Sequence, residues 1–383
     1  MPIHNLNDNL DRDVYCLMGI PVDAVDMDQA LARIYDAAER RRRLFLSTAN
    51  LNFVALSQRS PEFLQSLLDS DLVTPDGIGV IALGKLFGVS LPERVSGADL
   101  LEAMERGEHG GRQLKVFIFG GLEGVAERAC RTLAEGRGLT CCGFVFPGFG
   151  SVEEMSDAAI IDKINASDAD FVMASLGASK GQAWLMANRQ RLTIPVLSHF
   201  GAAVNFVAGS VERAPLLFQK AGLEWLWRIR QEPQLWSRYA SDAALMARIV
   251  SGRMLGLINE HRALARSAAQ GTTTISASWS GEVRVLSLSG SATPAAIAHC
   301  QNAFRNALHD GCPVTVDLSG MTFVSSRLLG LLQMFGRELR DRQRELSIVA
   351  SQSKVEKQFH LHGAGYLLDK PFTINNALSK KLA

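Results

Sequence analysis

The sequence has 383 residues, 47% of them hydrophobic and 21% charged. This composition is typical of a globular protein and excludes disordered, collagen-like and disulfide-scaffold classes. At about 150 residues per domain, the length predicts two or three domains. The 40 Lys and Arg residues nearly balance the 39 Asp and Glu residues, which leaves a net charge of +1. Because the chain has no overall positive field, we expect no nucleic-acid partner.

Cysteine spacing and hydropathy indicate in which cellular compartment the protein lies. The six cysteines form no C-x-x-C pair and no His/Cys cluster with the spacing of a zinc site, so we expect no metal, no cofactor and reduced thiols in the cytosol. Met1–Cys16 is polar and acidic, unlike a signal peptide. Val196–Gly209 comes nearest to a membrane span but is shorter than the roughly 18 residues that a span requires. Any membrane contact is therefore expected from one side.

Short apolar runs alternate with helical periods over the first two hundred residues. The predicted elements are the helix Met27–Arg43, the strand Leu44–Thr48, the helix Pro61–Asp69, an apolar segment ending at Thr74, the strand Lys115–Phe119, the helix Val125–Glu135, the strand Phe171–Leu176, a helix ending at Arg191 and the strand Pro195–Ser198. This alternation predicts an α/β fold, with a Rossmann-like, mostly parallel sheet covered on both faces. Ligands of such sheets bind beyond the carboxyl ends of the strands, so the loops there should form one crevice.

Residues 210–262 differ in character. They are expected to form helices broken at Pro215 and Pro233, and they carry Trp225, Trp227 and Trp236 together with eight basic residues and five acidic ones. A basic, tryptophan-bearing segment suits lipid headgroups or phosphates. It could equally form a helical hairpin that packs its tryptophans on the sheet, and the composition leaves both interpretations open.

A small, polar linker is expected over residues 263–273, and a second α/β domain over residues 274–383. The second domain has its own alternation of elements: the strand Val283–Leu288, the helix Pro294–His309, the strand Val314–Leu318, the helix Arg327–Arg340, the strand Leu346–Val349 and the helix Lys354–His362. We therefore assign residues 1–262 to a first domain, with 210–262 as its helical appendage.

Asp76 is the first candidate for chemistry. It follows Pro75 and precedes Gly77 at a predicted strand end. A carboxylate on a glycine-rich loop at the carboxyl edge of a sheet is a candidate general base. The alternative is that Asp76 only turns its own loop, as the aspartate of many Pro-Asp-Gly sequences does.

Two glycine-rich segments also follow strands. Gly120–Gly124 is typical of a turn whose backbone amides hold a phosphate, but it departs from the dinucleotide pattern G-x-G-x-x-G. Gly177–Gly181 has the form G-x-S-x-G of a hydrolase nucleophile elbow around Ser179. Its only partners before the linker would be Asp242 and His261, which lie in the appendage, a poor setting for a rigid triad. His199 lies beside the crevice, where it could contact a ligand or close the core.

Ordered segments of the first domain resemble the WecG/TagA/CpsF family of bacterial glycosyltransferases. The resemblance covers roughly Val14 to Tyr239. It is carried by the segments Ser47–Asn50, Ser70–Gly79, Pro92–Leu100, Phe119–Gly121, Ser175–Ala178, Phe206–Gly209, Arg213–Pro215, Gly222–Arg228 and Glu232–Pro233. The set is specific because the segments occur together and in this order.

The resemblance implies a metal-independent, inverting transferase. Such enzymes move a sugar, often N-acetylmannosamine, from a UDP-sugar donor to a polyprenyl-diphosphate-linked sugar in cell-surface or exopolysaccharide synthesis. It places the enzyme in the cytoplasm, peripheral on the inner face of the cell membrane. Asp76 matches the proposed general base and Thr48 its polar companion, and the resemblance assigns no cofactor.

The resemblance also implies binding residues. Expected substrate-binding residues are Asn50, Gly77, Gly97, Asp99, Gly120, Gly121, Lys180, Gln182 and Asn205. Expected diphosphate-binding residues in the appendage are Arg228, Arg230 and Arg238. Gly181-Gln182 stands where the family usually has a Gln-Glu pair, Asn205 replaces a usual Asp, and Gln234-Leu235 occupies a position that is usually basic. A hexosyl donor other than UDP-N-acetylmannosamine therefore stays open. So does a degenerate scaffold that acts as an interaction protein.

The second domain resembles the STAS fold of anti-sigma-factor antagonists. The segment Val314–Gly320 followed by Phe323–Ser326 carries this resemblance. Ser326 matches the serine that some members phosphorylate, but the flanking Asp and Gly of those members are absent. We therefore expect a docking domain that works without phosphorylation, with an unknown protein partner, and a homo-oligomer stays open.

Overall fold

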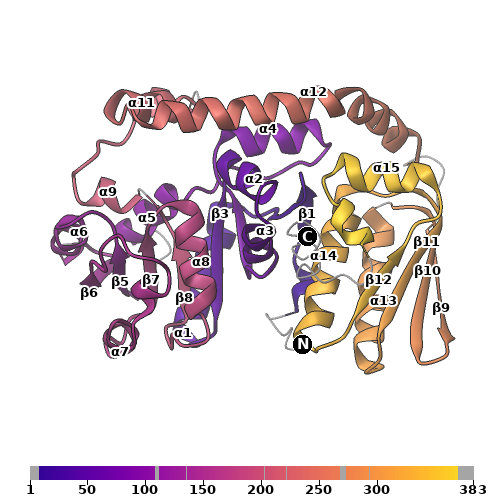
Figure 1. Cartoon of the computed structure of the whole chain (residues 1–383), viewed down its shortest axis with the longest axis horizontal. Coiled ribbons are helices and arrows are strands. Elements are labelled where there is room, and N and C mark those ends of the chain that lie inside the picture. Colours follow the sequence, from indigo (N-terminus) through magenta and orange to yellow (C-terminus); the bar gives the residue numbers. More distant parts are fainter. Residues whose placement is uncertain are drawn as a thin grey trace.

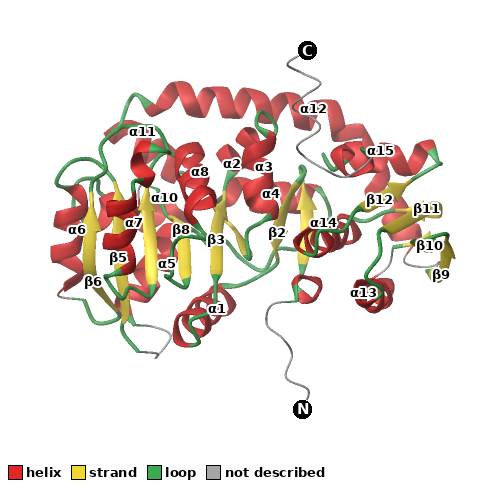
Figure 2. Ribbon diagram, turned by 60° about the horizontal axis from the view of Figure 1, so that its bottom comes forward, coloured by secondary structure: helices red, strands yellow, loops and turns green. Residues whose placement is uncertain are grey.

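The computed structural model describes residues 8–107, 112–134, 136–201, 203–220, 222–267, 273–292 and 294–369. Within this part of the chain, the larger sheet has six parallel strands in the order β4-β3-β8-β7-β5-β6 (Figures 1 and 2). Its strands are β3 (Leu44–Ala49), β4 (Leu72–Pro75), β5 (Leu114–Gly120), β6 (Leu139–Val145), β7 (Phe171–Ser175) and β8 (Val196–His199). The prediction of a mostly parallel sheet is confirmed.

Helices cover both faces of this sheet. They are α1 (Met27–Glu39), α2 (Leu51–Ser57), α3 (Pro61–Leu68), α4 (Ile78–Leu86), α5 (Gly97–Arg106), α6 (Val125–Ala134), α7 (Ala158–Asn165), α8 (Ala178–Asn188) and α9 (Ala203–Val207). Local sequence explains several of their ends. Asp26 and Gln29 form a capping box at the start of α1, and Ser60 caps α3 ahead of Pro61. The helices α2 and α4, which follow strand ends, and the helix α5 after them were not predicted.

An antiparallel hairpin precedes the sheet. Its strands, β1 (Val14–Leu17) and β2 (Ile20–Asp23), were absent from the sequence-based prediction. Strand β2 lies beside β4, the edge strand of the sheet. The Asp23 carboxylate accepts a hydrogen bond from the Val73 amide, with 2.7 Å between the two atoms. The hairpin thereby covers the edge of β4 that faces away from β3.

The appendage forms three helices, α10 (Leu216–Lys220), α11 (Glu224–Gln231) and α12 (Leu235–Ser267). The helices break at Pro215 and Pro233, as expected. Helix α12 is 33 residues long and runs across the top of both units in Figure 1. It continues through residues 263–267, which were expected to be linker, and residues 268–272 lie outside the described part of the chain. Among the described helices, none is long and apolar enough to cross a membrane.

The second unit is a smaller α/β sandwich whose sheet has the order β12-β11-β10-β9. Its elements are β9 (Thr274–Ser280), β10 (Val283–Ser291), α13 (Pro294–His309), β11 (Val314–Phe323), α14 (Ser326–Asp341), β12 (Leu346–Val349) and α15 (Ser353–Leu361). Strand β9 pairs antiparallel to β10, and the other pairs are parallel. The three predicted strands and three predicted helices are present, and β9 is additional.

The two units share part of a core. Leu10, Val14 and Cys16 belong to the same buried cluster as the apolar side chains of the second unit. Short 3-10 turns complete the described chain, at Asn9–Asp11, Glu154–Ser156 and Gly365–Leu368. The N-terminal segment therefore packs against residues more than 300 positions away in the sequence.

A disulfide joins Cys130 on α6 to Cys141 on β6, with 5.0 Å between their Cα atoms. This differs from the expectation of reduced thiols. The two cysteines are 11 positions apart and form no recognisable motif, so only the packing of α6 against β6 reveals the pair. Cys16, Cys142, Cys300 and Cys312 are free thiols.

Candidate functional site

Asp76 lies at the carboxyl edge of the sheet, directly after β4. The Asp76 amide donates a hydrogen bond to the Ala49 carbonyl at 2.8 Å, and the Val95 amide donates to the Pro75 carbonyl at 2.8 Å. These bonds fasten the loop to the end of β3 and to the segment before α5. Gly77 follows with a φ of 94°, which favours glycine because it has no Cβ. The backbone therefore holds Asp76 in one position at the start of α4.

The surroundings of Asp76 make its carboxyl group a weak acid. Its pKa is raised to about 7, chiefly by burial and next by the neighbouring charge of Asp99. Arg94 lowers this pKa, Glu224 raises it, and a hydrogen bond from the Asn50 side chain lowers it. A carboxyl group with a pKa near neutrality can accept a proton at physiological pH and release it again. This is the property expected of a general base.

Asn50 and Thr48 stand next to Asp76 at the end of β3. Asn50 caps α2, since its side-chain oxygen accepts a hydrogen bond from the Phe53 amide at 3.2 Å. That geometry leaves the amide nitrogen of Asn50 to donate to Asp76. Thr48 is buried and pairs in register with Thr74 of β4. The sequence-based prediction named both residues; Asn50 donates a hydrogen bond to Asp76, and the catalytic role of Thr48 stays a prediction.

Gly97 allows α5 to approach this cluster. A Cβ at Gly97 would lie 3.2 Å from the Phe200 ring and 3.5 Å from the Thr48 hydroxyl. Ser96 caps the helix by accepting a hydrogen bond from the Asp99 amide at 3.1 Å. Asp99 is thereby placed in the first turn of α5, close enough to Asp76 to raise its pKa.

A network of charged side chains surrounds Asp99. Arg94 forms an ion pair with Asp99 at 3.0 Å and another with Glu224 on α11. Arg213 pairs with Asp99 and with Glu102. The network therefore fastens the appendage to the edge of the sheet that carries Asp76. Arg94, Arg213 and Glu224 were not predicted as site residues, although each lies in a segment that carried the family resemblance.

Gly120 and Gly121 close the turn after β5. Their φ angles are 92° and 87°, and a Cβ at Gly120 would lie 2.9 Å from the Ser175 carbonyl oxygen. The Gly121 amide donates to that same oxygen at 2.6 Å. This amide is thus engaged within the protein, and the two glycines bring the ends of β5 and β7 together.

The remaining predicted residues lie in different surroundings. Lys180 is exposed, and its amine donates to the Gly150 carbonyl at 2.9 Å. Gln182 is 1% exposed and donates to the Ser47 hydroxyl at 2.8 Å, beneath the strand ends. Asn205 on α9 is partly buried, and its backbone carbonyl accepts a hydrogen bond from the Ser210 amide. Of these three side chains, that of Gln182 is turned into the core.

The hydrolase alternative receives no support from the backbone. Ser179 lies in the first turn of α8 after Gly177, whose φ is −65°. A nucleophile elbow requires a strained turn, and this is an ordinary helix start. His199 is buried with its ring nitrogen 2.7 Å from the Leu176 carbonyl, and burial lowers its pKa. His199 is therefore an uncharged side chain packed at the edge of the hydrophobic core. The side chain of His261 lies outside the described part of the chain.

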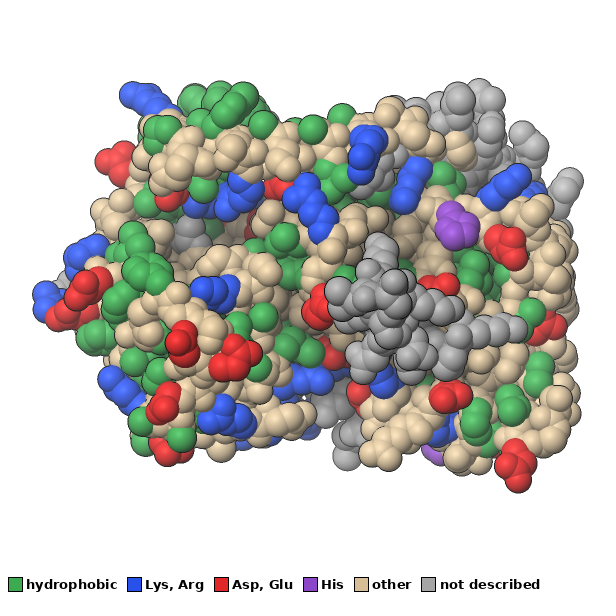
Figure 3. All heavy atoms as spheres, viewed as in Figure 1, with side chains coloured by type: hydrophobic (Ala, Val, Ile, Leu, Met, Phe, Trp, Pro, Cys, Tyr) green, Lys and Arg blue, Asp and Glu red, His purple; other side chains and the backbone are tan. Residues whose placement is uncertain are grey.

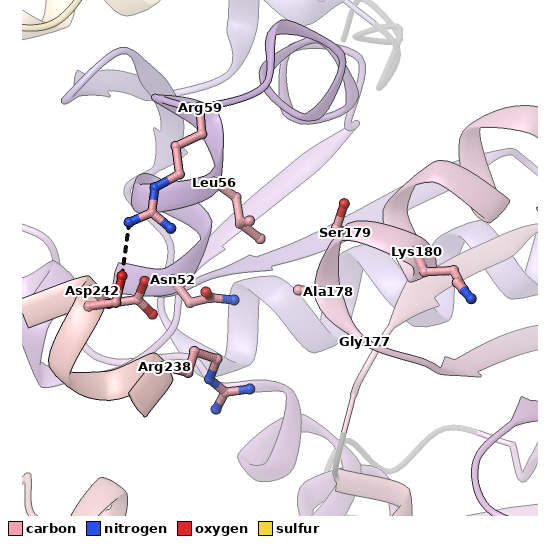
Figure 4. Close-up of a pocket in the computed structure, with 10 residues that line it drawn as sticks. Asn52, Leu56, Arg59, Gly177, Ala178, Ser179, Lys180, Arg238 and Asp242 are labelled. Carbon is pink, nitrogen blue, oxygen red and sulfur yellow. Dashed lines mark hydrogen bonds between the residues drawn. The ribbon is translucent and has the colours of Figure 1, made fainter. Parts of the chain in front are cut away.

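An open pocket of about 460 Å³ lies between α2, the start of α8 and α12 (Figure 4). Its lining includes Asn52, Arg59, Lys180, Arg238 and Asp242. The dashed line in Figure 4 marks the hydrogen bond from Arg59 to the Ser241 hydroxyl, at 3.2 Å. The guanidinium groups of Arg59 and Arg238 lie beside this hollow and suit a phosphate group, whereas the Lys180 amine is turned away toward the Gly150 carbonyl. Arg238 is one of the three predicted diphosphate-binding residues.

The appendage exposes large apolar side chains next to cations. Leu217 is 80% exposed, Trp236 59% and Trp225 41%. No residue of α11 is buried. The Arg230 guanidinium lies 5.6 Å from the centre of the Trp227 ring, and Arg228 pairs with Glu232 at 3.1 Å. Figure 3 shows the hydrophobic side chains gathered along the edge formed by α11 and the start of α12. The alternative in which the tryptophans fill the core does not fit α11.

No group of three or more His, Cys, Asp or Glu side chains suited to a metal ion occurs among the described residues. The carboxylates near Asp76 are instead neutralised by Arg94 and Arg213. Charge balance at this site therefore comes from guanidinium groups.

Residues 15–258 match the family described as "Glycosyl transferase WecG/TagA/CpsF family", and residues 275–369 match the STAS domain of the type "Mlab, STAS domain". The chain is 29% identical over 205 residues to an N-acetylglucosaminyldiphosphoundecaprenol N-acetyl-beta-D-mannosaminyltransferase from Bacillus spizizenii, covering 53% of this chain and 77% of the relative. A Staphylococcus aureus enzyme of the same name is 23% identical over 239 residues, covering 62% and 92%. Among solved structures, an anti-sigma factor antagonist from Mycobacterium paratuberculosis is 22% identical, covers 29% of this chain and 96% of its own, and has a TM-score of 0.24.

Proposed function

Because this chain belongs to the glycosyl transferase WecG/TagA/CpsF family, we propose that it moves a hexosyl or N-acetylhexosaminyl group from a UDP-sugar to a polyprenyl-diphosphate-linked sugar. Two relatives that it resembles carry names for N-acetylmannosamine transfer to a diphosphoundecaprenol-linked sugar. N-acetylmannosamine is therefore the first donor to test. The departures at Gln182 and Asn205 make glucose and other hexoses the next donors.

The observation that supports this function is the environment of Asp76. Its raised pKa and its hydrogen bond from Asn50 suit a base that takes the proton from the acceptor hydroxyl. The oxygen freed of its proton would attack the anomeric carbon. The bond from that carbon to the UDP oxygen would break on the opposite face, which inverts the configuration, and the electron pair would leave with UDP.

Cations of the appendage would stabilise the departing diphosphate. Arg238 lines the pocket beside α8, and Arg228 and Arg230 lie on α11. Guanidinium groups bind phosphate oxygens through paired hydrogen bonds and need no metal to do so. We therefore propose a metal-independent reaction, in which these arginines neutralise the charge that develops on UDP.

The exposed side chains of α10, α11 and α12 would hold the enzyme against the membrane that contains its lipid-linked acceptor. Tryptophan and arginine together favour the interface between headgroups and acyl chains. We propose that the enzyme is peripheral on the cytoplasmic face of that membrane. A vesicle-sedimentation assay tests this: Trp225→Ala with Trp236→Ala should weaken binding to anionic vesicles about tenfold or more. Trp279→Ala, at a residue 54% exposed in the STAS domain, is the matched control.

The decisive assay mixes the full-length protein with a panel of UDP-sugars and a polyprenyl-diphosphate-linked N-acetylglucosamine, with and without EDTA. Transfer that survives EDTA and is lost in Asp76→Asn supports the proposal. Undiminished transfer by Asp76→Asn would exclude Asp76 as the base. Calorimetric titration with UDP separates an active enzyme from a degenerate scaffold, because a scaffold would bind no nucleotide.

A further inference from the structure

Helix α14 of the STAS domain is enclosed on both sides. Every residue from Leu328 to Leu339 is buried, although the helix covers only one face of its own four-stranded sheet. The other side of α14 rests on strand β1 of the N-terminal hairpin. A Cβ at Gly330 would lie 2.1 Å from the Val14 carbonyl oxygen. The backbones of the two domains therefore touch directly.

Polar contacts accompany this packing along the helix. The Ser326 hydroxyl donates to the Cys16 carbonyl at 2.8 Å, and the Gln333 amide nitrogen donates to the Gly19 carbonyl at 2.9 Å. Arg327 pairs with Asp13 at 2.6 Å. Ser326 is buried in this contact. This surface of α14 is thus covered by residues of the same chain and is closed to an outside protein.

Arg337 extends the contact into the transferase sheet. Its guanidinium donates to the Ser70 carbonyl at 2.8 Å and pairs with Asp71. Arg12 donates to the same Ser70 carbonyl at 2.9 Å and pairs with Asp23 at 2.8 Å. Asp71 in turn accepts a hydrogen bond from the Phe45 amide at 2.7 Å. The amino end of β4 is therefore held by two buried arginines, one from each side of the domain boundary.

Strand β4 is the element that this contact can affect most. It is an edge strand of four residues with β3 as its ladder partner, and on its other side the Asp23 carboxylate of the hairpin accepts from the Val73 amide. Asp76 follows its last residue directly. A strand with one ladder partner has fewer hydrogen bonds to resist displacement than an interior strand. The bonds from Arg337 and Arg12 supply part of the support that a second neighbouring strand would give.

We propose that the STAS domain has its own transferase domain as its partner, and that Arg337 acts as a positioning residue by holding β4 and hence Asp76. The inference rests on the proposed function for the catalytic role of Asp76. It differs from the expectation of an unknown protein partner, because the contact lies within one chain. The STAS domain would then serve as a permanent part of the enzyme.

The test compares two full-length variants of one helix, Arg337→Gln and Arg342→Gln. Arg342 is the C-cap of the same helix, and in the described part of the chain its side chain contacts Glu338 of its own domain and no residue of the transferase domain, so it is the matched control. Amide hydrogen exchange over residues 70–76 should quicken about tenfold or more in Arg337→Gln and stay unchanged in Arg342→Gln. Equal exchange over this segment in both variants and the wild type would overturn the proposal.

Kinetics give a second readout that a merely structural role would not move. In Arg337→Gln, kcat should fall about tenfold with KM for the UDP-sugar within about twofold, because misplacement of the base affects the chemical step. Loosening β4 would hydrate Asp76 and lower its pKa, so the acidic limb of the kcat profile should move below pH 7. If Arg337→Gln only lowers the fraction of active enzyme, and the acidic limb of its kcat profile stays at the wild-type pH, the proposal is contradicted.

Asp71→Asn tests the same contact in case the Arg337→Gln variant does not fold. It removes the same ion pair from the transferase side and keeps an oxygen to accept from the Phe45 amide. It should change exchange and kcat in the same direction as Arg337→Gln. If the wild type transfers no sugar, the proposed function fails, while the exchange measurement still decides whether α14 holds β4.

Discussion

The carboxylates at the two ends of strand β4 lie in opposite electrostatic surroundings. At the amino end, Asp71 faces the Arg337 guanidinium and accepts a hydrogen bond from Phe45, so its charge is paired. At the carboxyl end, Asp76 is partly buried beside the like charges of Asp99 and Glu224, and its pKa is raised to about 7. A strand of four residues separates a carboxylate that is ion-paired from one whose pKa is raised.

This difference indicates how the protein divides stability from reactivity. A paired, hydrogen-bonded carboxylate such as Asp71 holds neighbouring segments of the fold together. A buried carboxylate near like charges costs stability when ionised, but it accepts a proton readily at neutral pH. The rigid amino end would then hold the reactive carboxyl end in place. The following changes test each end in turn.

The largest expected effect is on catalysis at the carboxyl end. Asp76→Asn keeps the shape of the side chain but cannot accept the proton, so kcat should fall about 10²- to 10⁴-fold. In the wild type, kcat should fall about tenfold per pH unit below pH 7, because Asp76 becomes protonated there. Sugar transfer measured across pH 5 to 9 checks both statements.

Asp168→Asn is the matched control for this change. Asp168 is an exposed residue that pairs with Lys115 at 2.9 Å, and asparagine tolerates its φ of 51°. It should retain full activity. A loss in Asp168→Asn equal to that in Asp76→Asn would show that the effect is not specific to the base.

The next effect concerns stability at the amino end. Asp71→Asn removes the closer of the two carboxylates that pair with the buried Arg337, while Asp341 remains at 3.7 Å, and should lower the free energy of unfolding by about 2 kcal/mol. Denaturant unfolding at pH 7 measures it. Asp310→Asn, which breaks the more exposed pair with Arg284, should cost less than about 1 kcal/mol. Equal losses in the two variants would mean that Arg337 gains no special support from Asp71.

A third change separates the two domains without altering charge. Gly330→Ala forces α14 away from the Val14 carbonyl and should cost about 1 to 3 kcal/mol through overpacking. Gly252→Ala in α12 has open space around the new methyl group and should be neutral or stabilising by up to about 1 kcal/mol. Thermal unfolding compares the two. A stabilising Gly330→Ala would show that the backbones do not touch in solution.

The last prediction concerns the free energy of unfolding that the wild type loses when Asp76 ionises. Because burial raises the folded-state pKa of this carboxyl, the protonated form is favoured in the native protein. Its contribution to stability is complete below about pH 4 and is lost as the pH rises through 7. Asp76→Asn should therefore be more stable than the wild type by up to about 4 kcal/mol at pH 8 and equal to it at pH 4. A variant destabilised at both pH values would contradict the raised pKa.

Local sequence patterns were sufficient for the sheet and for the position of Asp76. The strands β3, β5, β7 and β8 are short apolar runs between helical periods, and this pattern alone predicts buried parallel strands. Pro75 and Gly77 mark the end of β4 because each restricts or frees one backbone angle. Thr48 and Asn50 were named as site residues through the family resemblance; Asn50 donates a hydrogen bond to Asp76, and Thr48 lies near the end of the neighbouring strand β3.

Contacts between distant segments could not be predicted in this way. The hairpin β1–β2 is too short and too uniformly buried to show the alternation of a surface strand. Gln182 matched a substrate-binding position by its place in a loop, yet the structure turns its side chain toward Ser47. Arg94 and Arg213 are ordinary surface residue types until α5 and the appendage bring acids to them.

The sequence by itself determined a near-neutral chain of 383 residues, its two α/β units and the loop that carries Asp76. Each of these follows from residue types at neighbouring positions, since periodicity and turn chemistry are local properties. Only the tertiary structure decided that Arg337 holds Ser70 and Asp71, 267 and 266 positions away. The same packing decided that Asp99 and Glu224 surround Asp76. Electrostatic energy depends on distance in space and on burial, and neither quantity follows from the order of the residues in the sequence.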